Sequence, residues 1–259
     1  MQIDDKQTQV IRRVSHAGLP LALVFTASLC LTACKTKPAE DSGFLPQSQL
    51  LKEQRERAPF DRVWIKNGFK KESCKALIIA PVNTGYLLKN TGWAAANPAS
   101  LILDQSAKDL ATFTRDTFVK AFNNDPRHRF PIVSRPGPGV VVLELAIVEL
   151  VPSHAVISAV GLIAPFAQAP ALAVASKIAG KGTSVAIEGR LRDSVTGEVL
   201  MMFADREEPP FRIISLKAIT WYGDAEDSIE TWSKQLVELA NTPKTKKVED
   251  ASNFTLLPW

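Results

Sequence analysis

The stretch TSVAIEGRLRDSVTGEVLMMFADR, residues 183–206, decides the fold of this chain. It contains two runs rich in strand-forming residues, 183–193 and 198–206, separated by turn-forming residues. Asp193 can accept hydrogen bonds from the backbone ahead of it, Thr196 belongs to the same turn, and Gly197 can adopt the left-handed conformation. The sequence therefore predicts an antiparallel hairpin with one apolar side (Val185, Ile187, Leu191) and one charged side (Glu188, Arg190, Arg192).

Further strands are predicted upstream of this hairpin. Residues 140–151 are apolar on both faces of an extended chain, which is typical of a central strand covered from both sides. Pro and Gly alternate over residues 136–139 and predict the turn before it. Shorter strands are expected at residues 74–82, where Pro81 ends an apolar run, and at residues 130–134.

Two helices are expected around these strands. Apolar residues recur at steps of three and four over residues 104–122 and again over residues 224–240. Asp224 can cap the start of the second helix, and Pro243 prevents its continuation. Together these elements predict an α+β fold. It has a mixed or antiparallel sheet of about four to five strands packed with two main helices, preceded by a signal peptide and a flexible tether.

The N-terminal region has the pattern of a secretory signal. Arg12 and Arg13 precede an apolar run over residues 19–31, and small residues follow. The sequence Leu31-Thr32-Ala33-Cys34 is similar to the lipobox of bacterial lipoproteins. This resemblance implies cleavage between Ala33 and Cys34 and acyl chains, palmitate among them, on the new N-terminal cysteine. The alternatives are a plain signal peptide or an uncleaved anchor, with Cys34 an ordinary thiol.

The residues after Cys34 suggest where the anchored protein resides. Residues 35–42 are polar and contain Pro38, as expected of a flexible tether. In enteric-type sorting, an Asp directly after the lipidated cysteine retains a lipoprotein in the inner membrane, and this chain has Lys35 there. We therefore expect lipid anchoring at the outer membrane, facing the periplasm. The predicted organisation is a signal peptide at 1–33, a lipidated tether at 34–60, an α+β domain at 61–243 and a charged tail with an apolar end at 244–259.

One long segment in the middle of the chain is uncharged. Residues 155–176 carry no formal charge, and their length fits a membrane span. Gly161, Pro165 and Pro170 interrupt the segment, which favours a buried or interfacial helix instead. The sequence leaves open whether residues 155–178 form buried core, line a groove or contact the membrane.

The sequence gives little support for a metal, cofactor or catalytic site. Beyond the signal only two histidines occur, His128 and His154, and they share no metal-ligand spacing. No Gly-x-Ser-x-Gly motif is present, and residues 180–184 (GKGTS) depart from the phosphate-loop pattern. Cys74 is the only cysteine after Cys34, so we expect a buried, inert thiol and no disulfide framework in the domain. No cofactor and no metal are predicted.

The charges of the chain also point away from catalysis and from nucleic acids. Asp193 and Glu198 flank the hairpin turn, and turn chemistry accounts for the first of them. Asp205 and Arg206 end the second strand, where a solvated salt bridge is expected; the alternative is that they pair with charges of a partner. The net charge is only +4, and residues of both signs alternate along the chain. We therefore expect no nucleic-acid partner.

Several short motifs, in this order, resemble one family over most of the chain after the signal. They are Ser42-Gly43-Phe44-Leu45, Ala80-Pro81-Val82, Pro136-Gly137-Pro138-Gly139-Val140, Asp193-Ser194-Val195-Thr196-Gly197-Glu198-Val199, Asp205-Arg206 and Trp232. The chain is similar to the bacterial lipoproteins grouped as a domain of unknown function, DUF3313. One departure is that Glu207-Glu208-Pro209-Pro210 follows Asp205-Arg206, where the family often has basic residues and glycine. The resemblance implies a lipoprotein and supplies no catalytic residues.

From these observations we expect a non-enzymatic envelope lipoprotein that acts as a periplasmic scaffold or accessory factor of a cell-envelope complex. It would contact the membrane through Cys34 and bind a protein partner. One alternative is a lipoprotein that binds a lipid or small apolar ligand, with residues 155–176 lining the groove. A second alternative is an envelope hydrolase, which would need His128 or His154 beside a carboxylate and a nucleophile.

Overall fold

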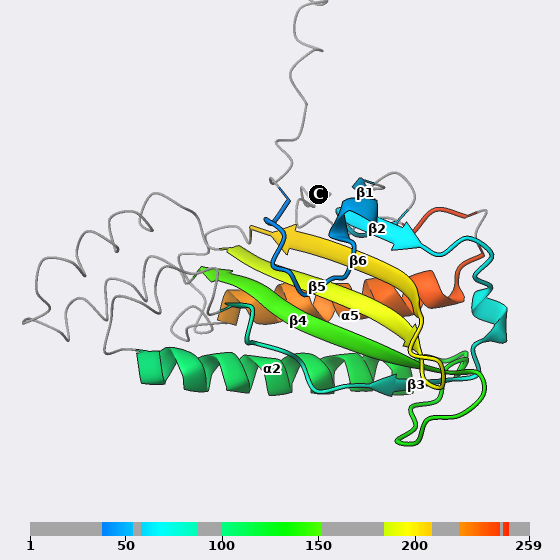
Figure 1. The fold of residues 1–259 in the computed structure, drawn as a ribbon. Helices are drawn as coiled ribbons and strands as arrows, with labels where there is room; N and C mark the ends of the chain where they lie inside the picture. Colours follow the sequence, from blue (N-terminus) through cyan, green and yellow to red (C-terminus); the bar gives the residue numbers. More distant parts are fainter. Residues whose placement is uncertain are drawn as a thin grey trace, which may run out of the picture. The chain divides into compact units, whose positions relative to one another are not determined.

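A computed structural model describes residues 38–53, 58–87, 100–151, 184–208, 223–243 and 246–248. These residues form one six-stranded sheet with the strand order β1-β2-β6-β5-β4-β3 (Figure 1). The strands are β1 Lys52–Glu53, β2 Arg62–Ile65, β3 Ala76–Ile79, β4 Val140–Val151, β5 Ser184–Asp193 and β6 Val199–Glu207. The helices are α2 Ser100–Asn123 and α5 Gly223–Asn241, together with the short 3-10 turns Ser48–Leu50 and Lys71–Ser73. The predicted α+β class is confirmed.

The hairpin of β5 and β6 and the long strand β4 form the middle of the sheet. β5 pairs antiparallel with both β6 and β4, and β3 pairs parallel with the other edge of β4. A register shift between Ile147 and Glu149 marks an irregularity in β4. Apolar side chains of β4 are buried on both faces, for example Leu145 on one and Ala146 on the other. The central position predicted for this strand is confirmed.

Both helices cover the same face of the sheet (Figure 1). The helices bury the residues that the predicted periodicity selects, among them Leu110 and Phe118 of α2 and Ile229 and Trp232 of α5. On the sheet side, Val185, Ile187 and other residues of the same parity meet them. We call this the helix face.

The opposite face of the sheet is covered by the segment of residues 39–51, drawn in blue in Figure 1. Phe44 and Leu45 are buried there against Ala146, Ala186 and other small or medium side chains of the central strands. We call this the segment face. Tyr86 also packs against this cluster of side chains, with its ring centre 5.5 Å from that of Phe44. Among the described residues, fewer buried apolar side chains belong to this face than to the helix face.

The sheet has one or two strands more than expected, and one expected strand is missing. β1 and β2 are too short to show an alternating pattern in the sequence. β1 and the buried residues Phe44 and Leu45 come from the range predicted as a tether, so part of that range packs on the domain. Residues 130–134 make only one bridge, between Ile132 and Leu77. Pro131 lacks an N–H group and uses its carbonyl to accept from Leu77, which limits pairing at this edge.

Several predicted features lie outside the described residues. They are the signal peptide at 1–33, the lipidation site Cys34, the segment 155–178 and the apolar end of the tail. His154 and residues 180–183 lie outside as well. Among the described residues, neither helix combines the length and hydropathy needed to cross a bilayer.

Candidate binding sites

The hairpin turn is built from the residues that the sequence singles out. Asp193 Oδ1 accepts hydrogen bonds from the backbone N–H groups of Val195 (2.9 Å) and Thr196 (2.8 Å) and from the Thr196 hydroxyl (3.1 Å). These bonds, those from the Thr196 backbone first, lower the pKa of Asp193. Gly197 has a φ of 73°. Glu198 forms an ion pair with Lys66, which follows β2. The Asp193 carboxylate therefore binds the turn and the Glu198 carboxylate binds Lys66, and the two do not form a shared site.

The expected solvated salt bridge is wrong for Asp205, whereas Arg206 does form ion pairs, one of them with the exposed Glu208. Asp205 is only 3% exposed, and it lies on the helix face. Its Oδ2 accepts from the indole Nε1 of Trp232 at 2.6 Å, and its Oδ1 accepts from the backbone N–H of Asp61 at 3.0 Å. Arg206 points to the other face, where it pairs with Glu149 at 2.8 Å and with Glu208. Neighbouring strand residues point to opposite faces, so these two side chains cannot pair with each other.

A polar cluster on the segment face binds the chain that follows the predicted lipidation site. Glu188 of β5 is 1% exposed and accepts from the Ser42 hydroxyl at 2.6 Å and from the Ser42 backbone N–H at 3.4 Å. The same hydroxyl accepts the N–H of Phe44 at 3.1 Å, while Gly43 has a φ of 82° that glycine adopts most easily. The Ser42 side chain therefore links the turn of the segment to the sheet.

Two arginines complete this cluster. Arg62 of β2 donates to the carbonyl of Ala39 at 3.0 Å. Arg190 of β5 donates to the carbonyl of Phe44 at 3.0 Å, and its guanidinium lies 4.6 Å from the centre of the Phe44 ring. Glu144 of β4 pairs with Arg190 and fixes its orientation. We call Arg62, Glu188 and Arg190, with the segment 39–45 that they bind, the clamp.

Burial makes the Glu188 carboxyl group of the clamp a weaker acid than an ordinary glutamate. Burial of Glu188 raises its pKa, the hydrogen bonds from Ser42 lower it in part, and the charge of Asp41 raises it further. Its pKa in the folded protein lies above the ordinary value of 4.5. In the clamp, ionisation of Glu188 is therefore unfavourable, and its side-chain hydrogen-bond partner, the Ser42 hydroxyl, is neutral.

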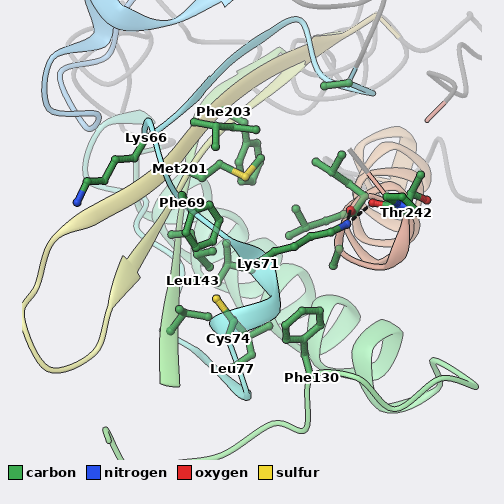
Figure 2. Close-up of a pocket in the computed structure, with 18 of the residues that line it drawn as sticks. Lys66, Phe69, Lys71, Cys74, Leu77, Phe130, Leu143, Met201, Phe203 and Thr242 are labelled. Carbon is green, nitrogen blue, oxygen red and sulfur yellow. Dashed lines mark hydrogen bonds between the residues drawn. The ribbon is translucent and has the colours of Figure 1, made fainter. Parts of the chain in front are cut away.

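The helix face contains a cavity of about 430 Å³ near the C-terminal end of α5 (Figure 2). Its floor is the sheet, with Leu143, Met201 and Phe203, and its walls come from residues 65–77 and the ends of the two helices. The described lining residues are mostly apolar, and they include three lysines and no Asp or Glu. These properties are those of a site for a small molecule with an apolar body.

Cys74 lines this cavity. The thiol is buried and free, as predicted, and burial raises its pKa. A thiol with a raised pKa stays protonated near neutral pH and is a poor nucleophile and metal ligand. Within the described part of the chain, no group of His, Cys, Asp and Glu side chains is arranged to bind a metal ion. His128 lies exposed in a turn with a φ of 44°.

The family model described as "Protein of unknown function (DUF3313)" matches residues 40–236. The chain belongs to the DUF3313 family. No curated protein matches the chain. The solved structures that are similar include two PelC dodecamers from Paraburkholderia phytofirmans, of which the first is a variant. They share 11% and 9% identity with TM-scores of 0.36 and 0.35, covering 67% and 68% of this chain and 95% and 94% of those chains. These values are too low to carry a function.

The structure gives a physical reason for two of the motifs that resemble the DUF3313 family. Ser42-Gly43-Phe44-Leu45 forms the centre of the clamp, and the Asp205 carboxylate joins β6 to Trp232 of α5. Sequence reasoning missed the clamp partners Arg62 and Glu188. The one signal in the sequence was Glu188, a glutamate among apolar strand residues. This pattern alone does not distinguish a buried glutamate from one that faces water.

Proposed function

We propose that this DUF3313 protein is a non-enzymatic lipoprotein of the bacterial envelope. It acts as a periplasmic scaffold or accessory factor of an envelope complex. The lipobox-like sequence ending at Cys34 supports the anchor, and Lys35 supports placement at the outer membrane. The proposed absence of catalysis rests on the sequence, which lacks a recognisable catalytic motif.

The observation that carries this proposal is the distance in sequence between the proposed anchor and the clamp. Arg62 binds the carbonyl of Ala39, and only residues 35–38 separate Ala39 from Cys34. Even fully extended, the chain from Cys34 to Ala39 spans only about 18 Å. An acylated Cys34 would therefore keep the folded domain close to the bilayer surface. Such a short connection suits a protein that works at the membrane surface and not one that reaches across the periplasm.

The first test is crosslinking in cells followed by mass spectrometry, with the native protein and a Cys34→Ala variant. We expect a defined protein partner with the native protein and loss of its crosslinks in the variant. Labelled palmitate should enter the native protein only. If the variant still partitions with the membrane and incorporates as much label, the anchor assignment is wrong. If no defined protein is captured, the scaffold role is wrong.

A second variant tests the short connection itself. A flexible Gly/Ser insertion between Lys35 and Thr36 lengthens the chain before the clamp and leaves acylation of Cys34 intact. We expect palmitate labelling to be unchanged and partner crosslinks to be reduced. An insertion of the same length at the exposed turn residue Val195 is the matched control. Equal partner capture by both insertion variants would contradict the need for a short connection.

A further inference from the structure

We propose that the cavity on the helix face is a binding site for a single-chain amphipathic anion, an acyl chain that ends in a carboxylate. The proposal is independent of the scaffold role, and the described lining residues of the site lie outside 155–176. Its existence would give the domain a ligand in addition to a partner.

The interior of the cavity matches the apolar chain of such a ligand. Leu143, Met201 and Phe203 extend from the sheet, and Phe69 and Phe130 close the sides (Figure 2). The volume of about 430 Å³ falls within the range of roughly 300–1,000 Å³ that is usual for small-molecule sites. A charged group would be costly in this interior, whereas methylene groups gain from leaving water. The interior therefore favours a hydrocarbon chain.

The charges at the edge of the cavity match an anionic head group. Lys71 lies at the wall, where its ammonium group donates to the carbonyl of Leu239 at 3.1 Å and to that of Thr242. Lys246 is exposed at the rim, and Lys66 extends away from the apolar side chains (Figure 2). Among the described lining residues there is no carboxylate, although Glu198 pairs with Lys66 from outside. The resulting positive potential selects an acidic head over a neutral one.

The test uses the full-length protein in native membranes and a palmitic acid probe that carries a diazirine and an alkyne. After irradiation, the labelled peptides are mapped by mass spectrometry. We expect label in the peptides that contain Phe69, Cys74, Leu143 or Met201. Acylation at Cys34 does not interfere, because every scored peptide lies beyond residue 57.

Two variants separate the apolar and the charged parts of the proposed site. Met201→Trp places a larger side chain in the cavity and should reduce labelling several-fold. Lys246→Glu reverses the charge at the rim and should also reduce labelling. The control is Lys234→Glu on the exposed surface of α5, where the native side chain is 75% exposed and makes a 3.8 Å pair with Glu230. It should leave labelling unchanged. If Met201→Trp does not fold, as judged by circular dichroism, Lys246→Glu alone decides.

Three results would overturn the proposal. The first is equal labelling by palmityl alcohol bearing the same diazirine, because this would exclude selection of an anionic head. The second is unchanged labelling in folded Met201→Trp and Lys246→Glu proteins. The third is cavity labelling that appears only when residues 251–259 are deleted, because the chain's own end would then be the native occupant. None of these results affects capture of a protein partner or acylation at Cys34, so the two proposals can fail separately.

Discussion

The two faces of the sheet are covered in different ways. The helix face meets two helices through large, fully buried side chains such as Phe118 and Trp232, and it includes the hydrogen-bonded carboxylate of Asp205. Among the described residues, the segment face meets mainly residues 39–51, and it binds part of this segment through the clamp. The difference indicates that the first face stabilises the domain and that the second positions the N-terminal chain.

Energetic magnitudes support this division. Full burial of a large apolar side chain contributes about 1.5–3 kcal/mol, and the helix face has many such side chains. A hydrogen bond contributes a net of about 0.5–1.5 kcal/mol, and the clamp depends on a few of them. The segment should therefore open at a lower free energy than the helices do, as a separate local event. Substitutions on the two faces should then affect different measurements.

The largest effect is expected from Asp205→Ala on the helix face. The change leaves two buried donors, the Trp232 indole and the Asp61 backbone N–H, without this acceptor. At about 1–3 kcal/mol for each donor, the free energy of unfolding should fall by about 2–6 kcal/mol. Urea denaturation followed by tryptophan fluorescence measures it. Asp116→Ala, at an exposed position of α2, is the control and should change stability little. A loss no larger than that of the control would show that Asp205 does not join β6 to α5.

A smaller loss is expected from Gly189→Ala, also on the helix face. A Cβ atom at this position would lie 2.2 Å from Phe203 Cζ, and Phe203 is itself stacked on Phe60 at 4.4 Å. Overpacking of this kind costs about 1–3 kcal/mol, measured by thermal or urea unfolding. The matched control is Gly137→Ala, where the new atom meets only Val140 Cγ2 at 3.8 Å. Equal stability of the two variants would show that Phe203 can move aside easily.

The elements predicted correctly from sequence are those whose signal is local. Over α2, α5 and the hairpin of β5 and β6, core-facing apolar residues recur at steps of two, three or four, and one segment alone reveals the pattern. β2 spans only Arg62–Ile65 and shows no such period. Residues 130–134 look like a strand, yet Pro131 limits their pairing.

The candidate sites were less predictable because their contacts are distant in sequence. Ser42 and Glu188 are separated by 146 positions, and nothing near either residue indicates the other. The alternation in β5 predicts on which face Glu188 lies, but it does not predict what covers that face. Asp205 is a similar case. Its position at the end of a strand suggests exposure, and only the fold shows that Trp232 of α5 lies beside it. The cavity likewise requires residues from the sheet, both helices and residues 65–74 together.

On the segment face, Ser42→Ala should change local opening more than global stability. The variant removes the hydroxyl that donates to Glu188 and accepts from Phe44, so the segment 39–45 should exchange its amide protons faster. The free energy of unfolding should fall by only about 1 kcal/mol. Hydrogen exchange with mass spectrometry measures the first effect, with Ser73→Ala as control because its hydroxyl bonds only locally, to Lys70. If α5 becomes as exchangeable as the segment, the two faces do not open separately.

The smallest effect is expected from Glu188→Gln, and it should depend on pH. Burial raises the pKa of Glu188 in the folded state, so the folded protein binds this proton more tightly than the unfolded chain does. The stability from Glu188 is therefore fully present below its ordinary pKa of 4.5 and is lost as the pH rises through the higher folded value. The glutamine side chain of the variant remains neutral throughout, so the variant lacks this decline.

The measurement is urea unfolding of the wild type and Glu188→Gln at several pH values between about 4 and 8. The variant should gain stability relative to the wild type as the pH rises, and the difference should level off once Glu188 is ionised in the folded protein. Asp41 and Arg62 act on Glu188 in opposite directions, so Arg62→Gln should strengthen the trend. A wild type that instead gains on the variant with rising pH would mean that the clamp favours a charged Glu188. The segment would then be bound mainly by ionic attraction and not by neutral hydrogen bonds.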